Sequence, residues 1–127
     1  MILSVGLHPS AVDYSRYPGL DEATLTARIE AGEAALREAG FDFVSCQVAA
    51  APDDAERMVR ERVAAQPVQI AMIGAGVRMA AEHTLLFERL VNVLVEVAPG
   101  IRFCFNTSPE TTSDALRRAK EAVIADL

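Results

Sequence analysis

Four short apolar runs separate longer stretches in which apolar residues recur every three or four positions. The runs cover residues 2–6, 41–48, 68–73 and 101–105. The third is almost continuously apolar, which is typical of a strand that is buried on both faces of a parallel sheet. We therefore expect four strands. The second should alternate, with Phe41 and Phe43 on one face and Val44 and Cys46 on the other.

The stretches that follow these runs have the spacing and the end signals of helices. The first begins at Asp21, a good N-cap residue, and should end at Gly40. The second begins at Pro52, because proline suits the first turn of a helix. The third covers residues 81–97. The fourth follows Ser108, where a capping serine precedes a proline and an acid.

The alternation of strand and helix, with short connections, predicts a parallel sheet with helices on both sides. We expect one α/β domain over residues 1–127, a three-layer α/β/α sandwich with strand order 2-1-3-4, the flavodoxin-like arrangement. The first and third strands are the most continuously apolar, so they belong in the centre. The other two carry Asp42, Gln47 and Arg102, which an edge position tolerates.

The amino-acid composition argues against some classes of binding partner. The 127 residues include 18 acidic and 12 basic side chains, for a net charge of −6, so no nucleic acid partner is expected. No stretch has the pattern of a membrane span or a signal peptide, and the expected location is cytoplasmic. Cys46 and Cys104 are interpreted as small buried hydrophobic residues, with a disulfide or a redox thiol as the alternative.

The carboxyl ends of the first and third strands are the expected place for a ligand. In the order 2-1-3-4 the chain leaves these strands in opposite directions, so their ends frame a crevice. The candidate binding residues are His8, Gly74, Gly76, Arg78 and Asn106. Glycines that permit positive φ, exposed N–H groups and an arginine suit a small anion that carries phosphate or carboxylate. In the alternative, the glycines only form a tight turn.

No residue pattern in the chain specifies a reaction. His8 could transfer a proton near neutral pH, with Arg78 stabilising charge; alternatively, it is a loop histidine bonded to the backbone. Met79 stands where a dinucleotide-binding fingerprint would have its third glycine, and no histidine or carboxylate spacing suggests a metal. Enzymatic activity and any cofactor therefore stay open, and no metal is expected.

The third predicted helix carries more apolar surface than one contact with the sheet requires. Beside its main apolar stripe, Phe87, Val91 and Val95 recur at spacings of four and form a second stripe. This stripe either packs within the chain or binds a second copy, making a homodimer. The alternative to a small-ligand site is thus a non-enzymatic interaction or scaffold protein that associates through this helix.

Three motifs in the second half of the chain carry a resemblance. They are Ile-Gly-Ala-Gly-Val-Arg at 73–78, the residues Glu-His and Leu-Phe-Glu at 82–83 and 86–88, and Asn-Thr-Ser-Pro at 106–109. With these motifs the chain resembles uncharacterised small bacterial α/β proteins of Rossmann or flavodoxin-like fold. The resemblance implies the fold class and assigns no functional residue.

Overall fold

The four expected strands form one parallel sheet in the order β2-β1-β3-β4, which confirms the predicted topology. The computed structural model describes residues 1–125. The strands are β1 (Ile2–Leu7), β2 (Phe43–Val48), β3 (Ile70–Ile73) and β4 (Arg102–Phe105). The central position of β1 and β3 follows from their apolar content, since both faces of a central strand are covered.

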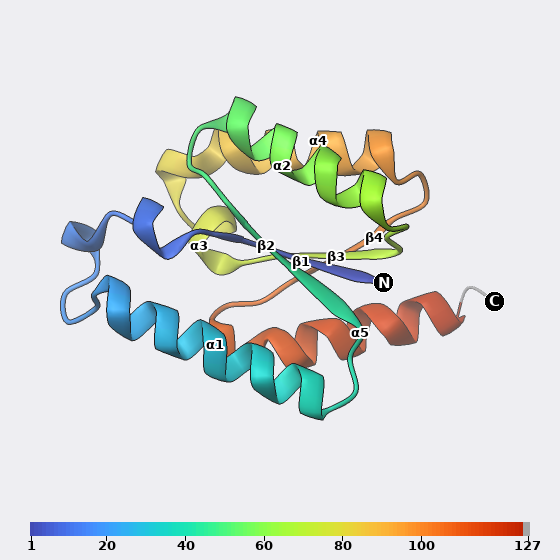
Figure 1. The fold of residues 1–127 in the computed structure, drawn as a ribbon, viewed down its shortest axis with the longest axis horizontal. Coiled ribbons are helices and arrows are strands. Elements are labelled where there is room, and N and C mark those ends of the chain that lie inside the picture. Colours follow the sequence, from blue (N-terminus) through green and yellow to red (C-terminus); the bar gives the residue numbers. More distant parts are fainter. Residues whose placement is uncertain (126–127) are drawn as a thin grey trace.

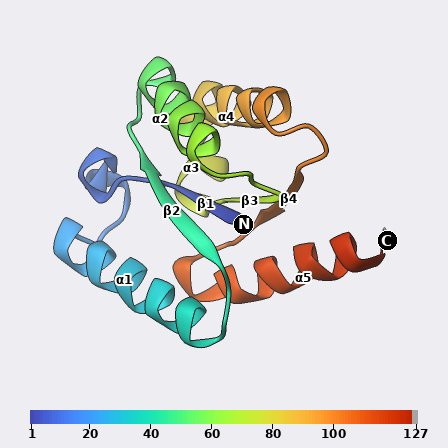
Figure 2. The same ribbon diagram turned by 45° about the vertical axis from the view of Figure 1, so that its right-hand side comes forward.

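Helices cover both faces of the sheet, as the α/β/α sandwich requires (Figures 1 and 2). One layer contains α2 (Pro52–Ala65) and α4 (Thr84–Val97), and the other contains α1 (Glu22–Glu38) and α5 (Thr112–Ala125). The predicted end of α1 at Gly40 is confirmed, because Gly40 has a φ of +89°, which favours glycine. No helix in residues 1–125 is both long and apolar enough to cross a membrane.

Two connections differ from the expectation. The segment after β3 is a short helix, α3 (Ala75–Arg78), and not a tight turn. The third predicted helix begins with a separate 3₁₀ turn, η3 (Ala81–His83), and α4 itself starts at Thr84. The spacing of apolar residues does not distinguish a 3₁₀ turn from the first turn of an α-helix, because each covers only three or four residues.

The two faces of the sheet are packed differently. On the α2 and α4 side the strands present a continuous buried core that includes Val5, Cys46 and Ile73. On the other side, the buried cluster includes only the first residues of β1 and β2, Ile2 and Phe43, whereas in β3 and β4 it extends to Met72 and Cys104. Here α1 packs mainly on η1 (Pro9–Ala11) and η4 (Pro109–Thr111). Beyond Ile2 and Phe43, this face of β1 and β2 is therefore not part of the buried cluster.

At each edge of the sheet an arginine side chain donates a hydrogen bond to a backbone carbonyl. Arg62 donates from Nη1 to the backbone oxygen of Ser45 at 2.8 Å, and Arg118 donates from Nη2 to that of Phe105 at 3.0 Å. Ser45 lies in β2 and Phe105 in β4, the two outer strands of the sheet. Charged side chains that occupy edge carbonyls discourage pairing with another strand.

Candidate functional site

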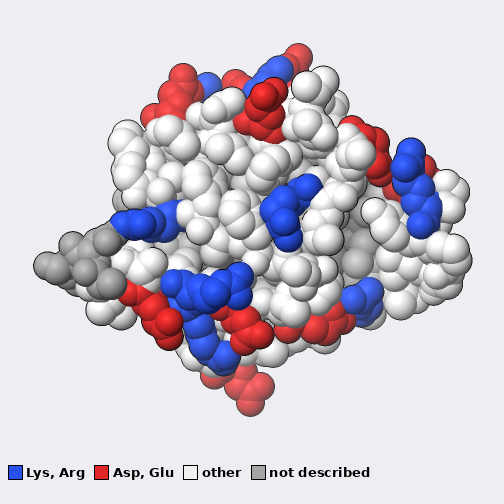
Figure 3. Space-filling model, turned by 180° about the vertical axis from the view of Figure 1, so that it is seen from behind, with Lys and Arg blue, Asp and Glu red and all other residues white. Residues whose placement is uncertain are grey.

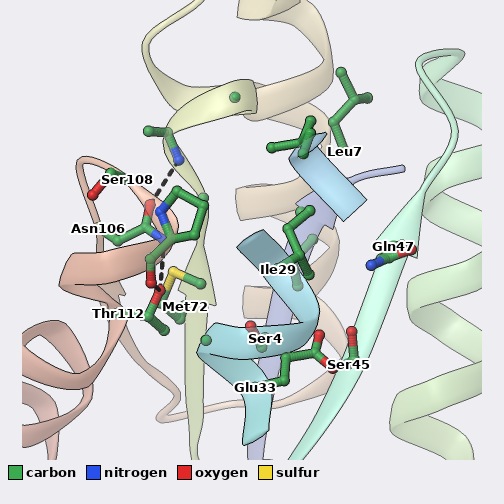
Figure 4. Close-up of a pocket in the computed structure, with 18 of the residues that line it drawn as sticks. Ser4, Leu7, Ile29, Glu33, Ser45, Gln47, Met72, Asn106, Ser108 and Thr112 are labelled. Atoms are coloured by element: carbon green, nitrogen blue, oxygen red, sulfur yellow. Dashed lines mark hydrogen bonds between the residues drawn. The ribbon is translucent and has the colours of Figure 1, made fainter. Parts of the chain in front are cut away.

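A cavity of about 150 Å³ lies between α1 and the sheet, at the carboxyl ends of the strands (Figure 4). The strands line it with Ser4, Gly6, Ser45, Gln47, Met72 and Gly74, and α1 lines it with Leu25, Ile29, Gly32, Glu33 and Leu36. Asn106, Ser108, Pro109 and Thr112 complete the wall on the side of α5. The place agrees with the general position of ligands in open α/β sheets.

The cavity exists because α1 is held away from the strands. Gly32 sits against the loop before α5, where a Cβ atom added to it would lie 3.5 Å from the backbone oxygen of Pro109. Arg28 donates from Nε and Nη2 to both carboxylate oxygens of Glu110, each at 2.8 Å. These contacts tie α1 to η4. The polar half of the sheet face stays open beneath it.

Three polar side chains of the lining have no protein partner. Ser4 and Ser45 lie directly opposite each other on β1 and β2, and Gln47 follows two residues later on the same face. Among residues 1–125, the hydrogen bonds do not include the side chains of these three residues. Hydroxyl and amide groups that face a cavity require water or a ligand to complete their hydrogen bonds.

Charge in the lining comes from one side chain. Glu33 extends from α1 towards Ser4 and Ser45 (Figure 4), and its side chain keeps only 20% of its surface exposed. The lining residues within the described part of the chain include no lysine, arginine or histidine. The lining thus carries one carboxylate and no cation among the described residues, a charge that does not favour an anion.

Asn106, one of the predicted binding residues, connects three elements. It is buried, with 6% of its surface exposed. Its Oδ1 accepts from the Ala75 N–H at 2.8 Å, and its Nδ2 donates to Thr112 Oγ1 at 2.8 Å. Thr112 Oγ1 donates in turn to the backbone oxygen of Pro109 at 2.9 Å. Asn106 thus borders the cavity while its own amide holds α3 and α5 to the end of β4.

Gly74 and Gly76 line the cavity, but they do not form the expected anion-binding turn. Gly74 has a φ of −72° and caps α3, and Gly76 lies within that helix. The positive-φ glycines among the described residues are Gly19, Gly40 and Gly100. Two backbone N–H groups at this point already have acceptors: Gly74 donates to the backbone oxygen of Val5 at 2.9 Å, and Ala75 donates to Asn106 Oδ1 at 2.8 Å.

Arg78 is separated from the cavity lining. Its Nη2 donates to the backbone oxygen of Asn106 at 3.0 Å, and its guanidinium lies 5.4 Å from the centre of the Phe105 ring. Its Nε is buried and has no hydrogen-bond partner among the described residues. The guanidinium therefore contacts the end of β4. Arg78 is not among the residues that line the cavity beside Gly74 and Gly76.

His8 is also outside the cavity lining, although it shares the carboxyl edge of the sheet with Gly74. Its side chain is exposed, and its Nδ1 lies 2.8 Å from Ser10 Oγ and accepts from the Ser10 N–H at 3.1 Å. This arrangement caps η1. It matches the alternative interpretation of a loop histidine that is bonded to the backbone.

The two cysteines are small buried residues on opposite faces of the sheet. Cys46 belongs to the core under α2 and α4, and Cys104 to the cluster under α5. Both thiols are free. Burial raises the pKa of Cys46 and raises that of Cys104 to about 11, so neither is a thiolate at neutral pH. Residues 1–125 also contain no group of three potential metal ligands.

The second stripe of α4 is partly used inside the chain. Phe87 and Val91 pack against the core, and the Phe87 ring lies 6.1 Å from the centre of the Phe105 ring. Val95 and Leu85 are the exposed apolar residues of this helix. The surface on the side of α4 and β4 has a broad area that carries few charges (Figure 3).

Sequence reasoning missed Ser4, Ser45, Gln47 and Glu33. A signal for the first three exists, because polar residues at every second position of a strand share one face. Ser45 and Gln47 have this spacing, and Ser4 alternates with the apolar Leu3 and Val5. Which of the two sheet faces they occupy, and which helix lies above them, depends on the tertiary structure.

Comparisons of the chain with family models, with curated proteins and with solved structures found no match.

Proposed function

We propose that this protein binds a small molecule in the cavity between α1 and the sheet, at the carboxyl ends of β1 and β3. The observation that carries the proposal is the set of unpartnered polar side chains, Ser4, Ser45 and Gln47, in a cavity with apolar walls. A site that served packing alone would hold apolar residues there, as the opposite face of the sheet does. Few polar groups in a largely apolar hollow are typical of ligand pockets.

The proposal concerns binding and assigns no reaction. The cavity lining, as far as the described residues form it, contains neither histidine nor cysteine. His8, the candidate proton carrier, caps η1 with its Nδ1. The small anion predicted from the sequence stays a prediction, and Glu33 in the lining favours other ligands. A test of ligand binding should therefore include a phosphate or carboxylate probe, so that the predicted anion is compared with other ligands.

The experiment is to fill the cavity by replacing Ser45→Val, and to compare this variant with the unchanged protein and with Gln66→Val, an exposed control at the end of α2. Valine suits a strand and removes a hydroxyl that has no partner. We expect Ser45→Val to raise the Tm by a few degrees and to abolish the chemical-shift changes that a fragment library produces at residues of the cavity.

Two results would overturn the proposal. One is a fragment library that causes no shift changes at β1, β3 or α1 in the unchanged protein. The other is a Ser45→Val variant that binds every fragment as well as the unchanged protein does. A fall in Tm for Ser45→Val, with Gln66→Val unaffected, would show that the hydroxyl supports the fold and would remove the observation on which the proposal rests.

The homodimer through Phe87, Val91 and Val95 is a second candidate function. Its support is the exposure of Val95, 53%, at the end of this stripe. Val95→Glu is the suitable test, because Phe87 and Val91 pack on the core and their replacement by an acid would unfold the chain. A dimeric mass that Val95→Glu converts to a monomeric one supports this candidate; a monomeric mass from the start excludes it.

A further inference from the structure

From the contents of the cavity we infer that its ligand is a small, mainly apolar molecule that carries a protonated amino group. This inference rests on the proposed function and names the class of ligand. The cavity contains one carboxylate and no basic side chain among the described residues that line it. The sequence alone suggested the opposite charge, because it placed Arg78 in the same crevice.

Glu33 has acceptor capacity that the protein does not use. The charged neighbour of its carboxylate is Arg37, one turn further along α1, with an N···O distance of 3.8 Å. This distance is too long for a hydrogen bond. Arg37 has 61% of its side chain exposed and stacks 4.8 Å from the centre of the Phe43 ring, which draws it away from the cavity. An ion pair of this kind contributes little.

The acceptors around this point match the donors of an ammonium group. An ammonium has three N–H donors and accepts no hydrogen bond. Ser4 and Ser45 are directly opposite each other on neighbouring strands, and Glu33 reaches towards them from α1 (Figure 4). The carboxylate supplies a charged acceptor and the two hydroxyls supply neutral ones. Groups from three separate elements thus line the same part of the cavity (Figure 4).

The rest of the cavity fits an apolar body. Leu25, Ile29 and Leu36 of α1 face Met72 of β3 across it. A cavity of about 150 Å³ holds a molecule of about the size of benzene. The ligand class is therefore a compact ring or a short branched chain that bears an amine, and not a nucleotide or a sugar phosphate.

The test uses three probes of similar shape and different charge: benzylamine, benzyl alcohol and benzoate. Dissociation constants are measured by chemical-shift titration on the whole chain. We expect benzylamine to bind most tightly, with an affinity about tenfold above that of benzyl alcohol, and benzoate to bind most weakly. Ser45→Ala should lower the affinity for benzylamine about threefold.

Glu33→Gln is the decisive variant, and Glu30→Gln is its matched control. Glu30 lies on the exposed side of α1, so both variants change the net charge of the protein by the same amount. We expect Glu33→Gln to remove the preference for benzylamine over benzyl alcohol and Glu30→Gln to keep it. If both variants lose the preference equally, the overall negative charge causes it and the inference is wrong.

The outcomes separate this inference from the proposed function. If none of the three probes binds at the cavity, and the fragment library also fails, both are overturned. If the three bind equally, the cavity is a ligand site and the inference about the amine is overturned. Tightest binding of benzoate would overturn it as well and would support the anionic ligand that the sequence suggested.

Discussion

Asn106 offers the most direct test of how the rim of the cavity is built. Asn106→Ala removes two side-chain hydrogen bonds of 2.8 Å, one from the Ala75 N–H and one to Thr112 Oγ1. The cavity rim depends on both, because they hold α3 and the start of α5 to the end of β4. The residue is buried, so water does not replace the lost partners without a rearrangement.

The magnitude follows from what each partner loses. A buried N–H that is left without an acceptor costs about 1–3 kcal/mol, and the Ala75 N–H, which is half-buried, should cost about 1–2 kcal/mol. Thr112 Oγ1 loses only an incoming donor, since it still donates to Pro109, and this loss costs about 0.5–1 kcal/mol. We therefore expect Asn106→Ala to lower the free energy of unfolding by about 1.5–3 kcal/mol.

Urea denaturation followed by circular dichroism measures this change, and hydrogen exchange of the Ala75 amide reports on the bond itself. Asn92→Ala is the matched control, because Asn92 is exposed on α4 and alanine there favours the helix. We expect faster exchange at Ala75 in Asn106→Ala and a stability within about 0.5 kcal/mol of the unchanged protein in Asn92→Ala. A loss below about 1 kcal/mol for Asn106→Ala would refute the reasoning.

Three further predictions concern α3, the thiols and the contact of α1 with η4. Gly76→Ala should stabilise the protein by about 0.5 kcal/mol, because Gly76 is helical and no atom lies within 4 Å of the added Cβ. At pH 8 Cys104 should stay unreactive to a thiol reagent until the chain unfolds, since its pKa is about 11. The Arg28 and Glu110 pair should show a coupling energy of about 0.5–1 kcal/mol in a double-mutant cycle.

The pH dependence of this pair has a definite sign. Hydrogen bonds from Arg28 lower the pKa of Glu110 from its usual 4.5 to about 2. The contribution of the pair to stability is therefore complete above about pH 4.5 and is lost as the pH falls towards 2. A coupling energy that stays constant from pH 6 to 2 would contradict this prediction.

Destabilisation by Gly76→Ala, or rapid modification of Cys104 in the folded protein, would contradict the other two predictions.

Local patterns along the chain determined the secondary structure and most of the topology. The apolar run at 68–73 predicted a central strand, and β3 occupies that place beside β1. Asp21 predicted the start of α1, and its Oδ1 accepts from the Thr24 N–H at 2.7 Å. These features could be predicted from the sequence because helix and strand periodicity, helix caps and turn glycines each depend on only a few neighbouring residues.

The site depended on contacts between residues that are far apart in the chain. Asn106 was placed at the correct edge from the sequence, yet its partner Ala75 lies 31 residues away and could not be identified from spacing. Arg78 and His8 were grouped with the glycines because all of them follow strands. The structure directs Arg78 to Asn106 and the His8 ring to Ser10.

What the sequence by itself determined about this protein is therefore the parallel sheet, its strand order and the edge at which a ligand is expected. What only the tertiary structure decided is the inside of the site. Gly32 packs against Pro109 and Arg28 binds Glu110, so α1 lies over η4, and Glu33 lines the same cavity as Ser4 and Ser45. The physical reason is that a strand specifies which residues share a face, whereas the distance to the helix above it is set by contacts elsewhere in the fold.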